Sequence, residues 1–132
     1  MYVRFVTPER GGRGAHLGPF RAAYAFAEDD CVCAALREAL SIEIAWFRAE
    51  LPVPPWRAFK VKSRGGWRDD GLCWFVDDAR EMIAHAFVLA ALLRDCGLPV
   101  VKLATRSPGQ ILYRDAWQIV AKPAAATPVA WE

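Results

Sequence analysis

The sequence predicts an α+β domain with a mixed sheet of four or five strands and three helices mainly on one face. Three observations support this. The 132 residues suit one domain with its own core. A hydrophobic fraction of 55%, with 6 Trp and 7 Phe, is typical of a folded chain. Apolar residues recur with the period of strands in some segments and of helices in others. We place the domain at 1–123 and expect an extended or frayed tail at 124–132.

The N-terminal half is predicted to form a strand, two helices and an edge strand. Tyr2–Val6 is rich in β-formers, as a strand is. After a glycine-rich loop, Pro19 suits the first turn of a short helix, where its missing N–H costs nothing. The second helix, about residues 31–50, carries an apolar stripe at helical spacing, and the prolines that follow end it. Phe59–Lys62 alternates apolar residues with lysine, as an edge strand does.

The C-terminal half is predicted to contain a strand–helix–strand unit after a turn-rich loop at 63–71. Its parts are a strand at 72–76, a helix at 78–96 with a capping box of Asp78 and Glu81, and a strand at 100–105. Such a crossover joins parallel strands in nearly all cases. Two short strands beginning at Ile111 and Trp117 then add to the sheet as antiparallel partners.

Charge and cysteine content narrow the class of protein. The net charge is +2, from 17 basic and 15 acidic residues, which calls for neither a nucleic-acid partner nor an acidic membrane surface. Met1 leads straight into a strand-like segment without a signal sequence, and the longest apolar run, at 84–93, is too short to span a bilayer. We therefore expect a cytoplasmic protein with 4 reduced cysteines and no membrane partner.

Glu43 is the most unusual polar residue of the chain. It lies in the middle of the apolar stripe of the helix predicted at 31–50. A carboxylate buried there must find a hydrogen-bond donor or stay protonated. The functional interpretation is an acid in a pocket beside Trp46. The alternatives are an ion pair with an arginine of the sheet, or a stripe more exposed to water than its period indicates.

The segment GLCWFVDDAREMIAHAFVLAALLRDCG at 71–97 raises a second possibility. His85 lies at the flank of the apolar side of its helix, so it could act as a base oriented by an acid, with Cys73 as nucleophile. The alternative is a half-buried histidine satisfied by Glu81 or Asp78, and an inert buried thiol. No oxyanion hole can be located from the sequence.

Phosphate, metal and nucleic-acid sites are weakly indicated. Gly12 and Gly14 fit the start of a dinucleotide fingerprint, but the third glycine is one place late. Arg10, Arg13 and His16 of this loop could hold an anion weakly. Cysteines at 31 and 33 have the wrong spacing for a zinc knuckle, so we expect no metal and no cofactor. The basic, Trp-bearing stretch at 60–68 could stack on single-stranded nucleic acid, but two aspartates follow at once.

The last polar group lies in SPGQILYRDAWQIVAKP, residues 107–123, and just before it. Two short strands gather Arg106, Tyr113, Asp115 and Gln118, of which Tyr113 and Gln118 could line the end of the sheet. The alternative is that Asp115 shapes a tight turn and the others are satisfied structural groups.

Three segments resemble a family of small uncharacterised bacterial proteins: EIAWFRAELPVP at 43–54, LCWFVDDA at 72–79 and PGQILYRDAWQIVAKP at 108–123. The family has a Cys-Trp-Phe strand end before a helix and a closing Pro-Gly…Tyr-x-Asp…Gln segment. The resemblance extends from Tyr2 to Pro123 and implies no activity. It draws attention to the following residues: Glu43, Trp46, Cys73, Trp74, Tyr113, Asp115 and Gln118.

Three functional hypotheses follow. The first is a binding or accessory domain, with a cleft for a small molecule or a protein partner between the helix that carries Glu43 and Trp46 and the strands that carry Trp74, Tyr113 and Gln118. The many tryptophans also fit self-association into a homo-oligomer. The second is a small hydrolase or transferase that uses Glu43 or the Cys73/His85 pair. The third, weak nucleic-acid binding through the basic loops, is disfavoured by the charge balance.

Overall fold

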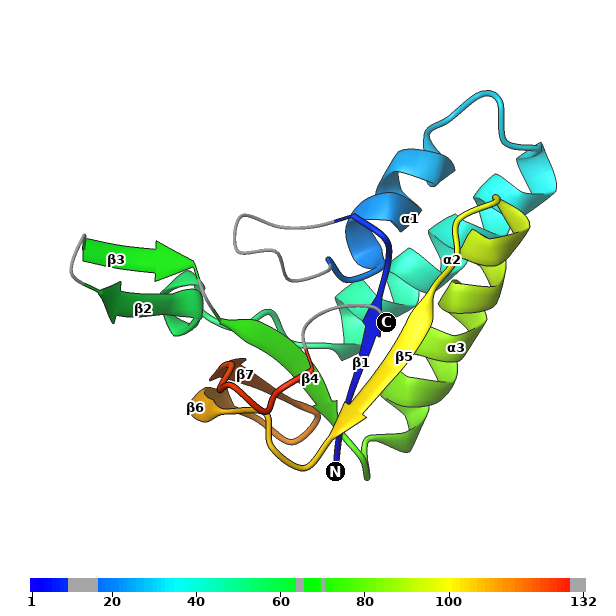
Figure 1. Cartoon of the computed structure of the whole chain (residues 1–132). Coiled ribbons are helices and arrows are strands. Elements are labelled where there is room, and N and C mark those ends of the chain that lie inside the picture. Colours follow the sequence, from blue (N-terminus) through cyan, green and yellow to red (C-terminus); the bar gives the residue numbers. More distant parts are fainter. Residues whose placement is uncertain (10–16, 64–65, 70, 129–132) are drawn as a thin grey trace.

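The computed structural model of the chain contains a five-stranded sheet with three α-helices on one face, and a separate two-stranded hairpin (Figure 1). It describes residues 1–9, 17–63, 66–69 and 71–128, and for 61–69 the backbone alone. The helices are α1 (Phe20–Ala27), α2 (Ala34–Glu50), the short 3-10 helix η1 (Trp56–Phe59) and α3 (Arg80–Asp95). The strands are β1 (Tyr2–Val6), β2 (Lys60–Ser63), β3 (Gly66–Asp69), β4 (Leu72–Val76), β5 (Val101–Thr105), β6 (Gln110–Arg114) and β7 (Gln118–Lys122).

The order of strands in the sheet is β5-β1-β4-β7-β6, and every pairing is antiparallel. The predicted α+β class, with five strands and three helices, is confirmed. One detail differs from the mixed sheet that we expected. The strand–helix–strand unit β4–α3–β5 is present, but β1 lies between its two strands and is antiparallel to both. β4 and β5 therefore run parallel to each other without forming a parallel ladder.

The two ends of α3 show where local sequence signals hold and where they fail. At the C-terminus, Gly97 has φ +89°, and the bonds from its N–H to Arg94 O and from Leu98 N–H to Leu93 O form a Schellman motif. At the N-terminus, the expected capping box of Asp78 and Glu81 is not formed. Residues 77–78 make a turn at the end of β4, so the helix begins later, at Arg80, and has no side-chain cap.

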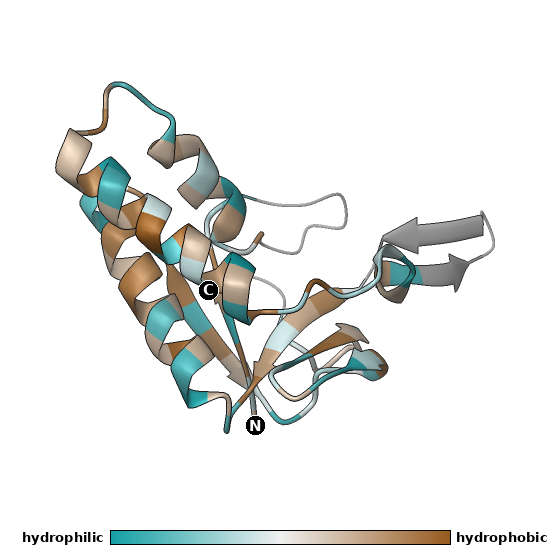
Figure 2. Cartoon of the chain, turned by 180° about the vertical axis from the view of Figure 1, so that it is seen from behind, coloured by the Kyte–Doolittle hydropathy of each residue, from teal (hydrophilic) through white to brown (hydrophobic). Residues whose placement is uncertain are grey.

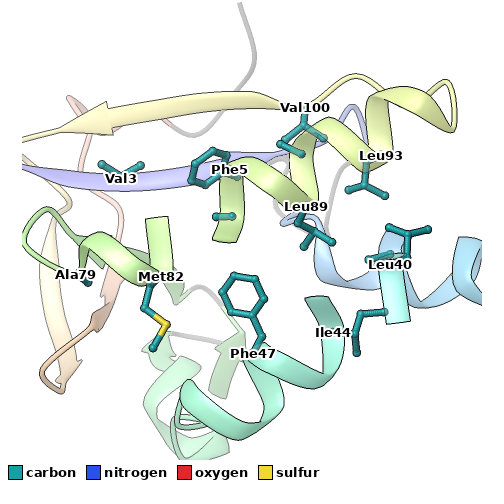
Figure 3. Close-up of a cluster of buried hydrophobic side chains, with 13 residues drawn as sticks. Val3, Phe5, Leu40, Ile44, Phe47, Ala79, Met82, Leu89, Leu93 and Val100 are labelled. Atoms are coloured by element: carbon teal, nitrogen blue, oxygen red, sulfur yellow. The ribbon is translucent and has the colours of Figure 1, made fainter. Parts of the chain in front are cut away.

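The main core lies between the helices and the sheet. Leu40 of α2 and Leu89 and Leu93 of α3 are fully buried, and Phe5 of β1 packs in the same cluster (Figure 3). Apolar residues are accordingly concentrated where the helices meet the sheet (Figure 2). The apolar stripe of α2 that the sequence predicts is the side that enters this core.

A second, smaller cluster lies on the other face of the sheet. Successive residues of a strand point to opposite faces, so Phe75 of β4 stacks on Phe47 on the helix side while Trp74 points away from the helices. Trp74 is fully buried there with Ile119 and Ala121 of β7. Within the described residues, no helix is long and apolar enough to cross a membrane.

Two segments differ from the sequence analysis. The loop expected at 63–71 contains strand β3, which pairs with β2 in a hairpin that projects beyond the sheet (Figure 1). In the expected tail, residues 124–127 form a turn in place of extended chain, because Thr127 is buried and its hydroxyl donates to Ser107 O at 2.6 Å. Residues 129–132 of the tail lie outside the described residues.

Candidate functional site

Three of the residues singled out in the sequence meet between α2 and α3. Glu43 Oε2 lies 2.7 Å from His85 Nδ1. The indole of Trp46 stacks on the imidazole, with ring centroids 3.5 Å apart and planes at 9°. Phe47 lies edge-on to both rings, at 5.0 Å from Trp46 and 6.3 Å from His85. We call Glu43, Trp46 and His85 the Glu43–His85 cluster.

The cluster explains how α2 tolerates an acid on its apolar side. Glu43 is 9% exposed, as its position on the stripe predicts, and a buried carboxylate needs a partner. That partner is His85, and not the arginine of the sheet that the sequence left as an alternative. The sequence analysis gave Glu81 or Asp78 as the hydrogen-bond partner of His85, whereas the bond is to Glu43, 42 positions away.

His85 is the member of the pair that faces solvent. Its side chain is 30% exposed, against 12% for Glu43. An ionised carboxylate only accepts, so Nδ1 donates in this bond whenever Glu43 is charged. Nε2 is then left for another partner, and no described residue hydrogen-bonds to it. The cluster can therefore hold an imidazole in one orientation and offer its second nitrogen to solvent.

A second polar group joins four other candidates, which come from β4, β6, β7 and the turn between β6 and β7. Cys73 Sγ donates to Gln118 Oε1 at 3.0 Å. Gln118 Nε2 donates to Pro52 O at 2.6 Å and to Asp115 Oδ2 at 3.0 Å. The Tyr113 hydroxyl donates to the same carboxylate oxygen at 2.9 Å. We call Cys73, Tyr113, Asp115 and Gln118 the Gln118 network. Its hydrogen bond to Pro52 O connects it to the backbone just after α2.

Asp115 is the charged centre of this network. Its Oδ1 accepts the backbone N–H groups of Trp117 at 2.8 Å and Gln118 at 3.0 Å, as an aspartate does in a tight turn. Burial works to raise the pKa of Asp115, but the hydrogen bonds from Trp117, Gln118 and Tyr113 together outweigh it and hold the pKa below its ordinary value. The hydrogen bond to this carboxylate in turn raises the pKa of Tyr113.

Cys73 has the chemistry of a structural thiol. Burial raises its pKa to about 12, although Arg4 acts in the opposite direction and Asp115 adds to the rise. A thiol with this pKa stays protonated near neutral pH, and the thiolate is the nucleophilic form. Its hydrogen bond goes to Gln118, while that of His85 goes to Glu43, so the structure does not bring Cys73 and His85 into the hydrogen-bonded pair that a Cys–His hydrolase needs.

The two remaining candidates lie apart from both groups. Trp74 points to the sheet face opposite the helices, and its Nε1 has no acceptor among the described residues. Arg106 is exposed just after β5, and no hydrogen bond or ion pair within the described residues joins it to another candidate. The residues from which we expected one cleft thus fall into separate groups.

A groove that the sequence analysis missed lies beside the Gln118 network. It has a volume of about 470 Å³ and is open to solvent. Its lining is mostly apolar and comes from the segment after α2, from η1, from the first residue of β2 and from the residue before β4: Val53, Pro54, Trp56, Phe59, Lys60 and Gly71. We call it the Trp56 groove. The three prolines around it were visible in the sequence, but they indicated only the end of a helix.

The floor of the Trp56 groove is fixed to the sheet. The N–H of Gly71 donates to Phe59 O at 3.0 Å. A Cβ at Gly71 would lie 2.8 Å from both Phe59 Cα and Val120 Cγ1, so glycine alone permits this close packing. The Gln118 network holds Pro52, which precedes the rim residue Val53, through the bond from Gln118 to Pro52 O. The candidates in this network therefore support the groove and do not line it.

Some site hypotheses fall on residues that are not described. The glycine-rich loop with Arg10, Arg13 and His16 lies outside the described residues, as do the side chains of 61–68 in the basic stretch. Among the residues that are described, no group of three or more metal-binding side chains occurs. Comparisons of the chain with protein-family models, with curated proteins and with solved structures find no match.

Proposed function

We propose that the protein is a small binding domain and that its ligand site is the Trp56 groove. The observation that carries this proposal is the exposure of one tryptophan on the wall of a groove. Val53 is 89% exposed and Trp56 67%, the two highest values among the large apolar side chains of the described residues. Exposed apolar residues gathered in one concave place are a mark of an interaction site.

Filling the groove gives a modest hydrophobic gain on the protein side. It would remove on the order of 50 Å² of apolar protein surface from water, which corresponds to about 1 kcal/mol, and the apolar surface of the ligand adds to this gain. Ordering the ligand offsets part of this gain. A groove of about 470 Å³ is within the size range of small-molecule sites in proteins.

The rim of the groove is ordered before a ligand arrives. Three of the five residues at 52–56 are prolines, whose φ angle is fixed by the ring. The hydrogen bond from the Gln118 side chain to Pro52 O and the one from Gly71 N–H to Phe59 O fix the backbone on two sides of the groove. A site that is already in its bound conformation loses less conformational entropy on binding, so more of the hydrophobic gain is kept.

The charges around Trp56 favour an acidic ligand. Arg57 Cζ lies 5.4 Å and Lys60 Nζ 5.9 Å from the centroid of the indole. An apolar wall beside the exposed guanidinium of Arg57 suits an aromatic or aliphatic acid and disfavours an amine of the same shape. We therefore infer a small apolar carboxylate as the ligand class.

A matched set of ligands tests this proposal. Indole-3-acetate, indole-3-acetamide and tryptamine share one ring and differ in charge. In a thermal-shift titration we expect the acid to raise the melting temperature most and the amine least, since a ligand of the folded state stabilises it. Trp56→Ala should abolish the shift, while Trp117→Ala, at a tryptophan outside the groove, should keep it.

Two results would contradict the proposal. One is the absence of any shift with all three compounds at millimolar concentration. The other is an equal shift in the wild-type protein and in Trp56→Ala. Sedimentation velocity on the same samples tests self-association: a dimer that is lost in Trp56→Ala would show that a second copy, and no small acid, covers this surface.

A further inference from the structure

The Glu43–His85 cluster is not used by the proposed binding function, and its geometry points to chemistry of its own. We propose that it is a proton-transfer site, at which His85 Nε2 acts as a general base toward water or a hydroxyl group in reactions of neutral esters. This site is independent of the Trp56 groove, since no residue of the cluster lines that groove.

The hydrogen bond between Glu43 and His85 gives the imidazole a defined role. Nδ1 is 2.7 Å from the carboxylate, so when Glu43 is ionised Nδ1 donates, and the neutral imidazole then carries its free lone pair on Nε2. The carboxylate also stabilises the imidazolium that forms when Nε2 takes a proton. Because Glu43 is almost buried and His85 is 30% exposed, the proton enters and leaves through the imidazole.

Trp46 fixes the plane of the ring. The indole stacks on one face of the imidazole, with ring centroids 3.5 Å apart and planes at 9°. The ring of Phe47, a core residue, lies edge-on to the imidazole, with an angle of 81° between the two planes. A base held in one orientation loses less entropy on reaching the geometry for proton transfer.

The charge of the cluster selects the substrate. A carboxylate directly behind the base repels anions, so phosphates and carboxylates are disfavoured next to Nε2. A neutral ester meets no such repulsion. In the step we propose, the oxygen of a water molecule bonds to the ester carbonyl carbon while Nε2 accepts a proton from that water. The bond from carbon to the leaving oxygen then breaks, and the leaving oxygen receives a proton from the imidazolium, giving an acid and an alcohol.

Hydrolysis of 4-nitrophenyl acetate, an activated neutral ester, tests the site. Cys31 and Cys33 are exposed and would react with the ester themselves, so every variant carries serine at both positions. In this background we expect His85→Gln to lower the second-order rate constant by roughly ten-fold or more. Glu43→Gln, which keeps the shape and loses the charge, should lower it as well, because the imidazolium is no longer stabilised. The rate should fall in D2O, since a proton moves in the transition state.

A measurement on the protein with both histidines intact guards against loss of folding in the variants. Diethyl pyrocarbonate should modify His85 at Nε2 and abolish hydrolysis, and hydroxylamine should restore it. His16→Gln is the matched control, because His16 is the other of the 2 histidines in the chain. The proposal is overturned if His85→Gln retains the full rate with native circular dichroism. It is also overturned if modification of His85 leaves the rate unchanged, or if an acyl-imidazole accumulates without an isotope effect, since the histidine would then act as a nucleophile.

Discussion

Gln118→Ala is the perturbation that most fully tests the polar network under the groove. Gln118 is 1% exposed, and its side chain makes three hydrogen bonds, with Cys73, Asp115 and Pro52 O. Each bond contributes about 1 kcal/mol net, and the buried methylene that is lost adds about 1 kcal/mol. The substitution should therefore lower the free energy of unfolding by ~3–4 kcal/mol.

Urea unfolding followed by far-UV circular dichroism, in reducing buffer, measures this change. For 132 residues, an unfolding entropy of roughly 0.28 kcal/mol/K converts it into a fall in melting temperature of about 10–14 °C. Gln118→Met keeps most of the volume and removes the three bonds, so it should lose about 2–3 kcal/mol.

Gln110→Ala, at an exposed glutamine of β6, is the control and should change stability by less than about 0.5 kcal/mol. If Gln118→Ala lies within about 1 kcal/mol of the wild type at unchanged m-value, the network does not support this end of the sheet. In that case the Gln118 network would not order the rim of the Trp56 groove either.

Two further predictions concern a turn and a thiol. Gly109 has φ +99°, and a Cβ there would lie 1.9 Å from Lys122 O, so Gly109→Ala should lower the free energy of unfolding by more than about 3 kcal/mol. Gly97→Ala, with φ +89° and open space around it, should lose only about 1 kcal/mol, and equal losses in urea titrations would contradict this account. The pKa of Cys73 is raised from 9.0 to about 12, so the stability it contributes is complete below pH 9 and is lost as pH rises from 9 toward 12. Between pH 8 and pH 10.5 the free energy of unfolding should therefore fall by up to about 2 kcal/mol more in the wild type than in Cys73→Ala. An equal fall in the two proteins would show that Cys73 ionises normally in the folded state.

Local signals in the sequence were sufficient for most elements of the fold. Strands β1 and β4 have the predicted bounds, and α3 ends where Gly97 indicated. The period of apolar residues and the conformational freedom of glycine act within a few residues, so they can be recognised without tertiary contacts. Strand β3 was missed because it begins at the second glycine of a pair and carries polar residues that resemble a loop.

The sites depended on contacts that sequence spacing does not encode. The burial of Glu43 followed from helix periodicity, and this prediction is confirmed. The identity of its partner, His85, could not be predicted in this way. The two residues are 42 positions apart, and only the packing of α2 against α3 brings them together. The Trp56 groove was invisible for a related reason. The prolines indicate that the helix ends, but the exposure of Trp56 depends on how η1 rests on β6 and β7.

The most direct test of the central claim, that the Trp56 groove is a ligand site, is a ¹⁹F NMR titration of protein labelled with 5-fluorotryptophan. The 6 tryptophans give separate signals, and Trp56→Phe identifies the one that belongs to the groove. The account predicts that indole-3-acetate shifts the Trp56 signal in a saturable manner and leaves the signal of buried Trp74 in place. A Trp56 signal that stays unmoved at millimolar ligand, or one that moves only together with all the others, would contradict it.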